Sequence, residues 1–447
     1  MNQQRVLILG AGMISGPTIE HLAQRYFVHV VDKNITSLVR TLRQVGDSDN
    51  ITSHVLGEGE DVVEYARRDL RYFDVVISLL PTDIHGDVAQ ACVEEGTHLV
   101  TASYESDRMR ELGDTARQKG IILLNECGLD PGIDHMEAMR MFDEIHRAGG
   151  KVVSFESYCG GFPSDSGNNP FGYQFSWSPK GVLLAAKNGA RYLQEGEVTE
   201  IPAGELFERP SNVKVLGLAD QLEGYFNRDS VGYVSVYGLE GEVKTFIRGT
   251  LRYAGWCETL SAMNKLGMLN SELDVSGKTL AEALAGVALE DLDSYSIGTK
   301  KSVAERLGVS EDHDIIKRLE WLGVFGQEQL PQGVSTKLDA FVNLMQQKMQ
   351  YEPGQTDMVA LQHKVTAEYQ HGENRIHTSV LVLYGDPKDY TAMAKTVGLP
   401  VAYATELILE GRLNGKSGLV IPTTAEIYAP ILEKLESVGI KFQSETN

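Results

Sequence analysis

Cysteine is scarce in this sequence, which contains four in 447 residues. The four stand apart, without the close pairs of a zinc site, and are too few for a disulfide framework, which favours a reducing compartment. Long apolar runs are also missing, because the one that follows Arg5 is short and broken by glycines. We therefore predict no signal peptide, no membrane span, no metal site and a cytoplasmic location.

Positively charged residues are also few compared with negatively charged ones. The chain has 41 lysines and arginines against 62 aspartates and glutamates, a formal net charge of -21 at pH 7. Nucleic acids and anionic membranes bind clustered lysine and arginine, so we predict neither as a partner. The hydrophobic fraction of 42% is ordinary for a globular protein, and the length is sufficient for two or three domains.

The first 130 residues alternate short apolar runs with amphipathic segments. This pattern is typical of an α/β fold with a doubly wound parallel sheet, a Rossmann-type domain. The predicted strands are 6–9, 28–31, 53–56, 75–79, 98–101 and 121–124. The predicted helices are 16–26, 35–45, 62–70, 83–95 and 106–119.

The rest of the chain predicts a second, mixed sheet and a helical insertion. Its predicted strands are 152–158, 232–237, 245–253, 365–369 and 377–383, and its main helices are 136–148, 390–413 and 424–438. We predict a dinucleotide-binding domain at 1–130 completed by 388–447, a mixed α/β substrate and dimerisation domain at 131–257 and 351–387, and a helical domain at 258–350. The active site is expected between the first two, in a homodimer.

A glycine-rich turn follows the first predicted strand. Gly10 and Gly12 allow a sharp turn from strand into helix and let the backbone approach a pyrophosphate at the helix N-terminus. Ser15 stands where the usual pattern has its third glycine, with Gly16 one residue later. The strand before the turn and the helix after it strengthen a motif that is weak alone. The predicted cofactor residues of this turn are Gly10, Gly12, Met13, Ile14 and Ser15.

Asp32 lies 20 residues after Gly12, at the end of the second predicted strand. A carboxylate there can accept hydrogen bonds from the ribose of an adenosine, which favours NAD over NADP. Lys33 leaves the choice open, because a neighbouring cation could attract a 2′-phosphate. In an alternative interpretation, Asp32 caps the helix that begins at residue 35.

Two more turns lie at the carboxyl edge of the predicted sheet, where doubly wound folds bind ligands. The turn 78–81 is predicted to contact the cofactor through Leu79, Leu80 and Pro81. The turn 101–104 offers hydroxyls for an amino-acid carboxylate or a nicotinamide, through Ala102, Ser103 and Tyr104. Alternatively, its hydroxyls cap the helix 106–119.

Several residues beyond this edge could do chemistry. Asp130, Asp134 and His135 share one short turn and could relay a proton in carbonyl or imine chemistry, although Asp134 could equally cap a helix and His135 could be structural. Cys159 could act as a thiol or pack as a small core residue. Planar guanidinium groups bind carboxylates, so Arg228, Arg248 and Arg252 are candidates for an anionic substrate, or ordinary surface charges.

At these residues the sequence resembles the glutamate-forming saccharopine dehydrogenase family, also called saccharopine reductase. The likeness runs in collinear order over nearly the whole chain. Its longest and most specific stretch is Asn125-Glu126-Cys127-Gly128-Leu129-Asp130-Pro131-Gly132-Ile133-Asp134-His135. Further matching stretches are 10–15, 103–104, 157–161, 169–178, 227–230, 248–253, 347–351 and 357–359.

The resemblance implies a reaction of lysine metabolism. Glutamate condenses with 2-aminoadipate 6-semialdehyde, and the imine accepts hydride from a reduced nicotinamide to give saccharopine. Asp130 and Tyr104 are the candidate proton donors, with a bound water as their rival. The saccharopine site is implied to comprise Ser103, Tyr104, Asp130, Arg228, Thr250, Leu251 and Arg252. Additional cofactor neighbours are implied to be Glu126, Cys127, Gly128 and Phe175.

One departure from that family concerns the cofactor. Its fungal members resemble NADP enzymes with an arginine after the second strand, where this chain has Asp32 and Lys33. NAD and NADP therefore both stay open. Two alternatives remain: a related carbon–nitrogen dehydrogenase acting on a polyamine-type imine, of the carboxynorspermidine or homospermidine class, and a non-catalytic NAD(H)-binding protein. Arg252→Ala is predicted to raise the KM for saccharopine and to leave cofactor affinity unchanged.

Overall fold

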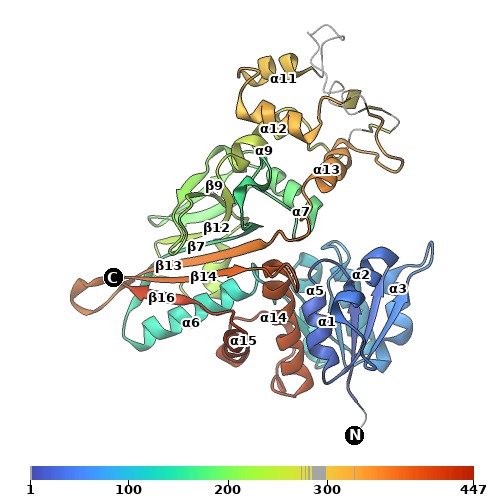
Figure 1. Cartoon of the computed structure of the whole chain (residues 1–447). Coiled ribbons are helices and arrows are strands. Elements are labelled where there is room, and N and C mark those ends of the chain that lie inside the picture. The colour runs from blue at the N-terminus through green and yellow to red at the C-terminus, as the bar shows by residue number, and fades with distance from the viewer. Residues whose placement is uncertain (1–2, 273, 277, 280–281, 284–298, 327) are drawn as a thin grey trace. The chain divides into compact units, whose positions relative to one another are not determined.

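Two units, each with its own sheet, make up the chain (Figure 1). The computed structural model describes residues 3–272, 274–276, 278–279, 282–283, 299–326 and 328–447. The first unit comprises Met1–Val152, Glu368–Glu373 and Gly385–Gln443. The second unit comprises Val153–Ala367, Asn374–Tyr384 and Ser444–Asn447.

The first unit contains a parallel sheet of seven strands in the described part of the chain, in the order β15-β6-β5-β4-β1-β2-β3. These strands are β1 (Arg5–Leu9), β2 (Phe27–Asp32), β3 (Ile51–Val55), β4 (Val75–Ser78), β5 (His98–Thr101), β6 (Ile122–Leu124) and β15 (Gly418–Val420). The order reverses between β1 and β4, which is where doubly wound folds bind dinucleotides. The Rossmann-type prediction is confirmed.

The helices of the first unit bury both faces of this sheet. They are α1 (Gly16–Ala23), α2 (Ile35–Val45), α3 (Val62–Asp69), α4 (His85–Glu95), α5 (Asp107–Gln118), α6 (Ile133–Arg147), α14 (Ala392–Leu409) and α15 (Ala425–Ser437). Four successive residues of β1, Val6 to Leu9, are at most 1% exposed, as an unbroken apolar run in a doubly covered strand requires. Figure 1 shows α14 beside α1, and β15 extends the sheet beyond β6.

The second unit contains a mixed sheet of nine strands in the described residues. They are β7 (Lys151–Pro163), β8 (Ala190–Gln194), β9 (Glu197–Ile201), β10 (Ser211–Val213), β11 (Leu222–Phe226), β12 (Thr245–Tyr253), β13 (Asp357–Glu368), β14 (Asn374–Tyr384) and β16 (Gln443–Thr446). β12 lies between its parallel partner β7 and its antiparallel partner β11. The predicted combination of a parallel and a mixed sheet is therefore confirmed.

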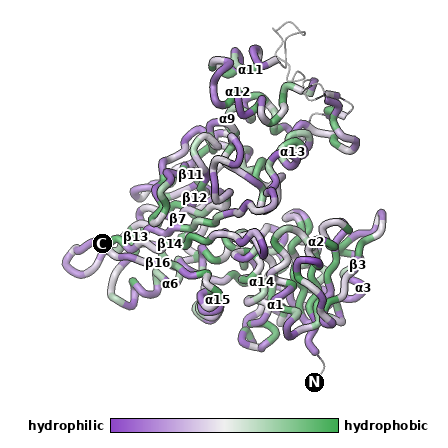
Figure 2. Tube along the Cα trace, in the orientation of Figure 1, coloured by the Kyte–Doolittle hydropathy of each residue, from purple (hydrophilic) through white to green (hydrophobic). Residues whose placement is uncertain are grey.

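Helices and sheet of the second unit share one hydrophobic core. The helices are α7 (Pro179–Leu184), α8 (Gly232–Val236), α9 (Trp256–Lys265), α11 (Lys300–Leu307), α12 (Asp314–Leu322) and α13 (Lys337–Lys348). Trp256, Leu319 and Phe341 from three of these helices are at most 1% exposed in that core. Figure 2 shows hydrophobic residues concentrated along the strands β7 and β12. The predicted helical segment 258–350 thus belongs to the same compact unit as the sheet.

Three features differ from the prediction. The chain passes between the units at Val152–Val153 rather than near residue 130, because α6 packs against α15 in the first unit. The prediction of a strand at 232–237 is wrong: its valines and tyrosines suit a strand, but the Asp229 carboxylate accepts a hydrogen bond from the Val231 N–H and the helix α8 follows. The short strands β8 to β11, β15 and β16 were not predicted.

None of the helices in the described part of the chain is both long and apolar enough to span a membrane.

Glu223 fixes the start of α9, directly after the strand that carries Arg252. Its buried carboxylate accepts hydrogen bonds from the backbone N–H groups of Cys257 at 2.6 Å and Gly255 at 3.2 Å. Glu223→Ala leaves both donors unpaired in the interior, and we expect it to cost about 2–4 kcal/mol of stability. Glu223→Gln keeps one acceptor oxygen and should lose about half as much. Thermal unfolding measures both, and equal melting temperatures for wild type and Glu223→Ala would contradict the assignment.

Candidate active site

The glycine turn after β1 has the shape that a dinucleotide needs. Gly10 adopts a φ of +103°, and a Cβ atom there would lie 2.8 Å from the carbonyl oxygen of Leu79. Only glycine fits this position without moving the backbone. A Cβ on Gly12 would meet nothing within 4 Å, and Ser15 leaves the first turn of α1 without a side-chain cap. The turn therefore combines open space with a helix N-terminus that no side chain caps, which suits a pyrophosphate.

Asp32 ends β2 beside this turn. Its carboxylate accepts hydrogen bonds from the N–H of Ala11 and the N–H of Asn34, both at 2.6 Å. The helix α2 is capped by Asn34, whose side chain accepts from the Ser37 N–H. The alternative role of Asp32 as the helix cap is therefore wrong, and its carboxylate is fixed at the position where a ribose is expected.

A buried histidine connects the ends of β4 and β5. His85 Nδ1 lies 2.8 Å from Ser78 Oγ, and His85 Nε2 lies 2.8 Å from Ser103 Oγ. Ser106 caps α5 by accepting a hydrogen bond from the Met109 N–H. The alternative in which the hydroxyls of 101–104 cap this helix is therefore wrong.

Tyr104 and Asp130 form a hydrogen-bonded pair at the same edge of the sheet. The Tyr104 hydroxyl donates to Asp130 Oδ1 at 2.7 Å, and both side chains are half-buried. A phenol bonded to a carboxylate can pass a proton in either direction, so the pair has the chemistry of a general acid–base group.

The turn that carries Asp130 is tied to the sheet by a buried carboxylate–imidazole pair. Glu126 has a φ of +61°, unusual for a residue with a side chain, and its Oε2 lies 2.7 Å from His135 Nε2. Both side chains are fully buried. The Glu126 N–H donates to the Ser103 carbonyl, and Glu126 Oε1 accepts from the Glu105 N–H. Asp134, buried beside His135, accepts from the Gly132 N–H at 2.6 Å. Through these contacts, Glu126, Asp134 and His135 hold together the turn that carries Asp130.

Arg252, in the second unit, is buried among aromatic rings. It is 4% exposed, and its guanidinium lies 5.0 Å from the ring centre of Tyr173, 5.9 Å from that of Tyr225 and 5.7 Å from that of Trp256. Burial raises the pKa of Tyr225 to about 12, so its hydroxyl stays neutral. Arg252 Nε and Trp256 Nε1 are buried donors without a hydrogen-bond partner in the described part of the chain. Such donors suit a carboxylate.

The other candidates in the second unit differ in exposure. Arg228 is exposed with a φ of +53°, whereas Arg248 is 2% exposed and stacks 4.5 Å above the Tyr233 ring. Phe175 and Cys159 are buried in the core, at 6% and 4% exposure. Thr250 is half-buried on β12 and Leu251 beside it is fully buried.

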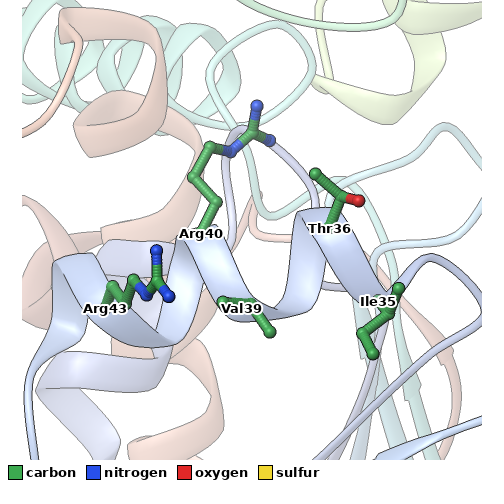
Figure 3. A pocket seen from close by; sticks show the side chains of 5 residues that line it. All are labelled: Ile35, Thr36, Val39, Arg40 and Arg43. Atoms are coloured by element: carbon green, nitrogen blue, oxygen red, sulfur yellow. The ribbon is translucent and has the colours of Figure 1, made fainter.

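A hollow of about 430 Å³ lies over α2 (Figure 3). All of its lining side chains project from this one helix. They are Ile35, Thr36, Val39, Arg40 and Arg43. None belongs to the predicted site, so we do not assign this hollow to the reaction.

The structure brings the predicted residues together in two sets. The first unit gathers the glycine turn, Asp32, and the edge that holds Ser103, Tyr104 and Asp130. The second unit holds the three arginines on or near β12. Prediction from the sequence missed His85 and the aromatic rings around Arg252. A signal for His85 was its place seven residues after Ser78, at the start of a helix that follows the turn predicted to contact the cofactor.

Two family models cover most of the chain. Residues 6–124 match the saccharopine dehydrogenase NADP binding domain, and residues 128–440 match the saccharopine dehydrogenase C-terminal domain. The chain belongs to the saccharopine dehydrogenase family. Its first unit thus contains a binding domain for a nicotinamide dinucleotide.

Two fungal members of this family match the chain over nearly the full length of both proteins. The chain is 38% identical to the NADP(+), L-glutamate-forming saccharopine dehydrogenase of Saccharomyces cerevisiae, with 99% of each chain covered. It is 36% identical to the enzyme of that name from Schizosaccharomyces pombe, with 98% of each covered. The apo structure of the Saccharomyces cerevisiae enzyme superimposes with a TM-score of 0.83 at 34% identity, covering 99% of this chain and 100% of that one.

Some relatives are longer. The mitochondrial alpha-aminoadipic semialdehyde synthase of Mus musculus is 36% identical over 99% of this chain, which spans 48% of that protein. The chain thus spans about half the length of this mammalian protein.

Arg252 is buried and Arg228 is exposed, so mutation of these two residues should have different consequences. Arg252→Ala should raise the KM for a carboxylate substrate at least about 10-fold, because a charged hydrogen bond contributes about 1.5–3 kcal/mol. It should also lower the melting temperature by several degrees, because it leaves a cavity among buried rings. Arg252→Met should restore the melting temperature but not the KM.

Arg228→Ala is the matched control, because Arg228 is exposed. It should raise the KM and leave the melting temperature unchanged. Steady-state kinetics and thermal unfolding of the three variants test this pair of roles, and an unchanged KM in Arg252→Met would remove Arg252 from the site.

Proposed function

We propose that this chain interconverts saccharopine with L-glutamate and L-2-aminoadipate 6-semialdehyde, by hydride transfer between the substrate and a nicotinamide cofactor. The observation that carries the proposal is the Tyr104–Asp130 hydrogen bond at the carboxyl edge of a dinucleotide-binding sheet. Support comes from the names of the fungal relatives, which match over their full length.

The glycine turn fits the cofactor that this reaction requires. The pyrophosphate would lie in the space over Gly12, against the uncapped first turn of α1. The ribose would be held by the fixed carboxylate of Asp32. When bound, the nicotinamide accepts a hydride in the oxidative direction and donates one in the reductive direction.

The Tyr104–Asp130 pair would handle the protons. In the oxidative direction, the secondary amine of saccharopine loses a proton from nitrogen and a hydride from the adjoining carbon, which gives an imine. Asp130 accepts the nitrogen proton through or beside the Tyr104 hydroxyl. Water then adds to the imine, and breakage of the carbon–nitrogen bond releases glutamate and the semialdehyde. In reverse, the same pair returns the proton.

Arginines would recognise the substrate, which carries three carboxylates. Arg252 Nε and Trp256 Nε1 are buried donors that a carboxylate would satisfy, and Arg228 offers an exposed guanidinium. Thr250 and Leu251 lie on the same strand as Arg252. This donor set favours a polycarboxylate over a cationic polyamine-type imine.

The proposal is tested by following nicotinamide absorbance with saccharopine and, in parallel, with carboxynorspermidine and homospermidine. We expect turnover with saccharopine alone. Turnover with the polyamine-type substrates only would support that class of carbon–nitrogen dehydrogenase instead. Cofactor binding without turnover of any of them would indicate a non-catalytic dinucleotide-binding protein.

Removing the proton-handling pair should slow the chemical step. Tyr104→Phe and Asp130→Asn preserve shape, so the KM values should change little, while kcat should fall about 10²- to 10⁴-fold, as is typical when general acid–base catalysis is lost. The pH dependence of kcat in each variant completes the test. A kcat within about twofold of wild type in both variants would exclude the pair and leave a bound water as the donor.

The choice between NAD and NADP depends on Asp32. The family model and the names of the fungal relatives favour NADP. The Asp32 carboxylate, held by the Ala11 and Asn34 N–H groups, favours the ribose 2′-hydroxyl of NAD and repels a 2′-phosphate. We propose that Asp32 disfavours NADP in this chain, in contrast to its fungal relatives, and that Lys33 only partly offsets this effect.

Asp32→Ser should therefore raise kcat/KM for NADP about 10-fold or more relative to NAD, because it removes a negative charge beside the 2′-phosphate. Lys33→Ser, the matched control, should shift the ratio in the opposite direction. Initial rates of saccharopine oxidation with each cofactor measure the ratio. If wild type already prefers NADP and Asp32→Ser leaves that preference unaltered, Asp32 does not determine the cofactor.

A further inference from the structure

His85 has no part in the function proposed above, yet it is a buried imidazole that contacts two serine hydroxyls, one of them in the proposed substrate site. It is the first residue of α4 and is 3% exposed. Its two ring nitrogens each lie 2.8 Å from a serine oxygen, Ser78 on one side and Ser103 on the other. The ring therefore connects the carboxyl ends of β4 and β5.

The imidazole is neutral at working pH. Burial lowers the pKa of His85 to about 4, against the smaller opposing effect of Asp83. A neutral imidazole carries one N–H, so one of the two serine contacts must be donated by the ring and the other accepted by it.

The tautomer of His85 therefore decides what Ser103 can offer a ligand. If Nε2 carries the proton, the ring donates to Ser103 Oγ, and the Ser103 hydroxyl proton is free to turn toward an acceptor. If Nδ1 carries the proton, Ser103 must donate to the ring, and its oxygen can only accept. A carboxylate needs a donor, so only the first tautomer suits a polycarboxylate substrate.

The backbone of Ser103 is also fixed by hydrogen bonds. Its N–H donates to Thr101 Oγ1 at 3.2 Å, and its carbonyl accepts from the Glu126 N–H at 3.1 Å. Ser78, at the other end of the chain of hydrogen bonds, is fully buried and can donate to Nδ1 of the ring. The contact between His85 and Ser103 thus concerns the hydroxyl of this residue, whereas its backbone is held by other partners.

We propose that His85 is a positioning residue: as the Nε2–H tautomer, it donates to Ser103 Oγ and directs the Ser103 hydroxyl proton toward a carboxylate of the substrate. This inference rests on the proposed function, because it takes Ser103 as part of the saccharopine site.

Two isosteric variants separate the two hydrogen bonds of the ring. The amide nitrogen of Gln can occupy the place of Nε2 and donate to Ser103, whereas Asn reaches only the place of Nδ1 and bonds Ser78. We expect His85→Gln to keep the KM for saccharopine within about threefold of wild type. His85→Asn should raise this KM about 10-fold or more, with a smaller change in kcat, and should match Ser103→Ala.

His98 provides the control for loss of a partly buried histidine in the same sheet. It lies at the start of β5, at the opposite edge, where its Nδ1 accepts from the Ile122 N–H. His98→Gln should leave the KM for saccharopine unchanged. Melting temperatures of all variants identify any that are merely unfolded.

Nitrogen NMR of histidine-labelled wild-type protein, with His85→Gln used to assign the signal, tests the tautomer without any turnover. We expect His85 to be the Nε2–H form and not to titrate between about pH 5.5 and 8.5. If wild type does not turn over saccharopine, the proposed function fails while this spectrum still reports on His85. An Nδ1–H or protonated ring, or a normal KM in folded His85→Asn when Ser103→Ala is impaired, would overturn the inference.

Discussion

The hydrogen bond between Glu126 and His135 is the constraint on which the candidate site depends. It joins two fully buried side chains across the turn 125–135 and holds Glu126 in a left-handed backbone conformation. Breaking it would remove a hydrogen bond between two fully buried polar side chains, which costs several kcal/mol. The same turn carries Asp130 to the Tyr104 hydroxyl and fixes the Ser103 carbonyl. The Glu126–His135 pair thus helps to fix where Tyr104 and Asp130, the proposed proton-handling pair, lie.

Much of the first unit could be predicted from the sequence, because its signals are local. Unbroken apolar runs gave the strands, and the glycine turn with Asp32 lies within one strand–helix–strand segment. The short strands β8 to β11, β15 and β16 were not predicted, because runs of three to five residues have little periodicity. The contacts of His85 were not predicted, because its partners, Ser78 and Ser103, come together only when β4 and β5 pair in parallel.

For Arg252, the structure decides between two predictions that the sequence left open. As a sequence position it was equally a substrate-binding residue and a surface charge, and the structure excludes the surface charge. A guanidinium among three aromatic rings is partly compensated by cation–π attraction, yet its Nε has no hydrogen-bond partner in the described residues. In the proposed site, this side chain both packs among the rings and binds a substrate carboxylate. Its two contributions can be separated only by variants that preserve packing.

The most direct test of the account is the identity of the products when purified protein oxidises saccharopine. Cleavage on the lysine side of the secondary amine should release glutamate and 2-aminoadipate 6-semialdehyde, each in equal amount to the reduced nicotinamide formed. Mass spectrometry of the reaction mixture measures all three. Release of lysine and 2-oxoglutarate, or no reduced nicotinamide with either NAD or NADP, would contradict the account.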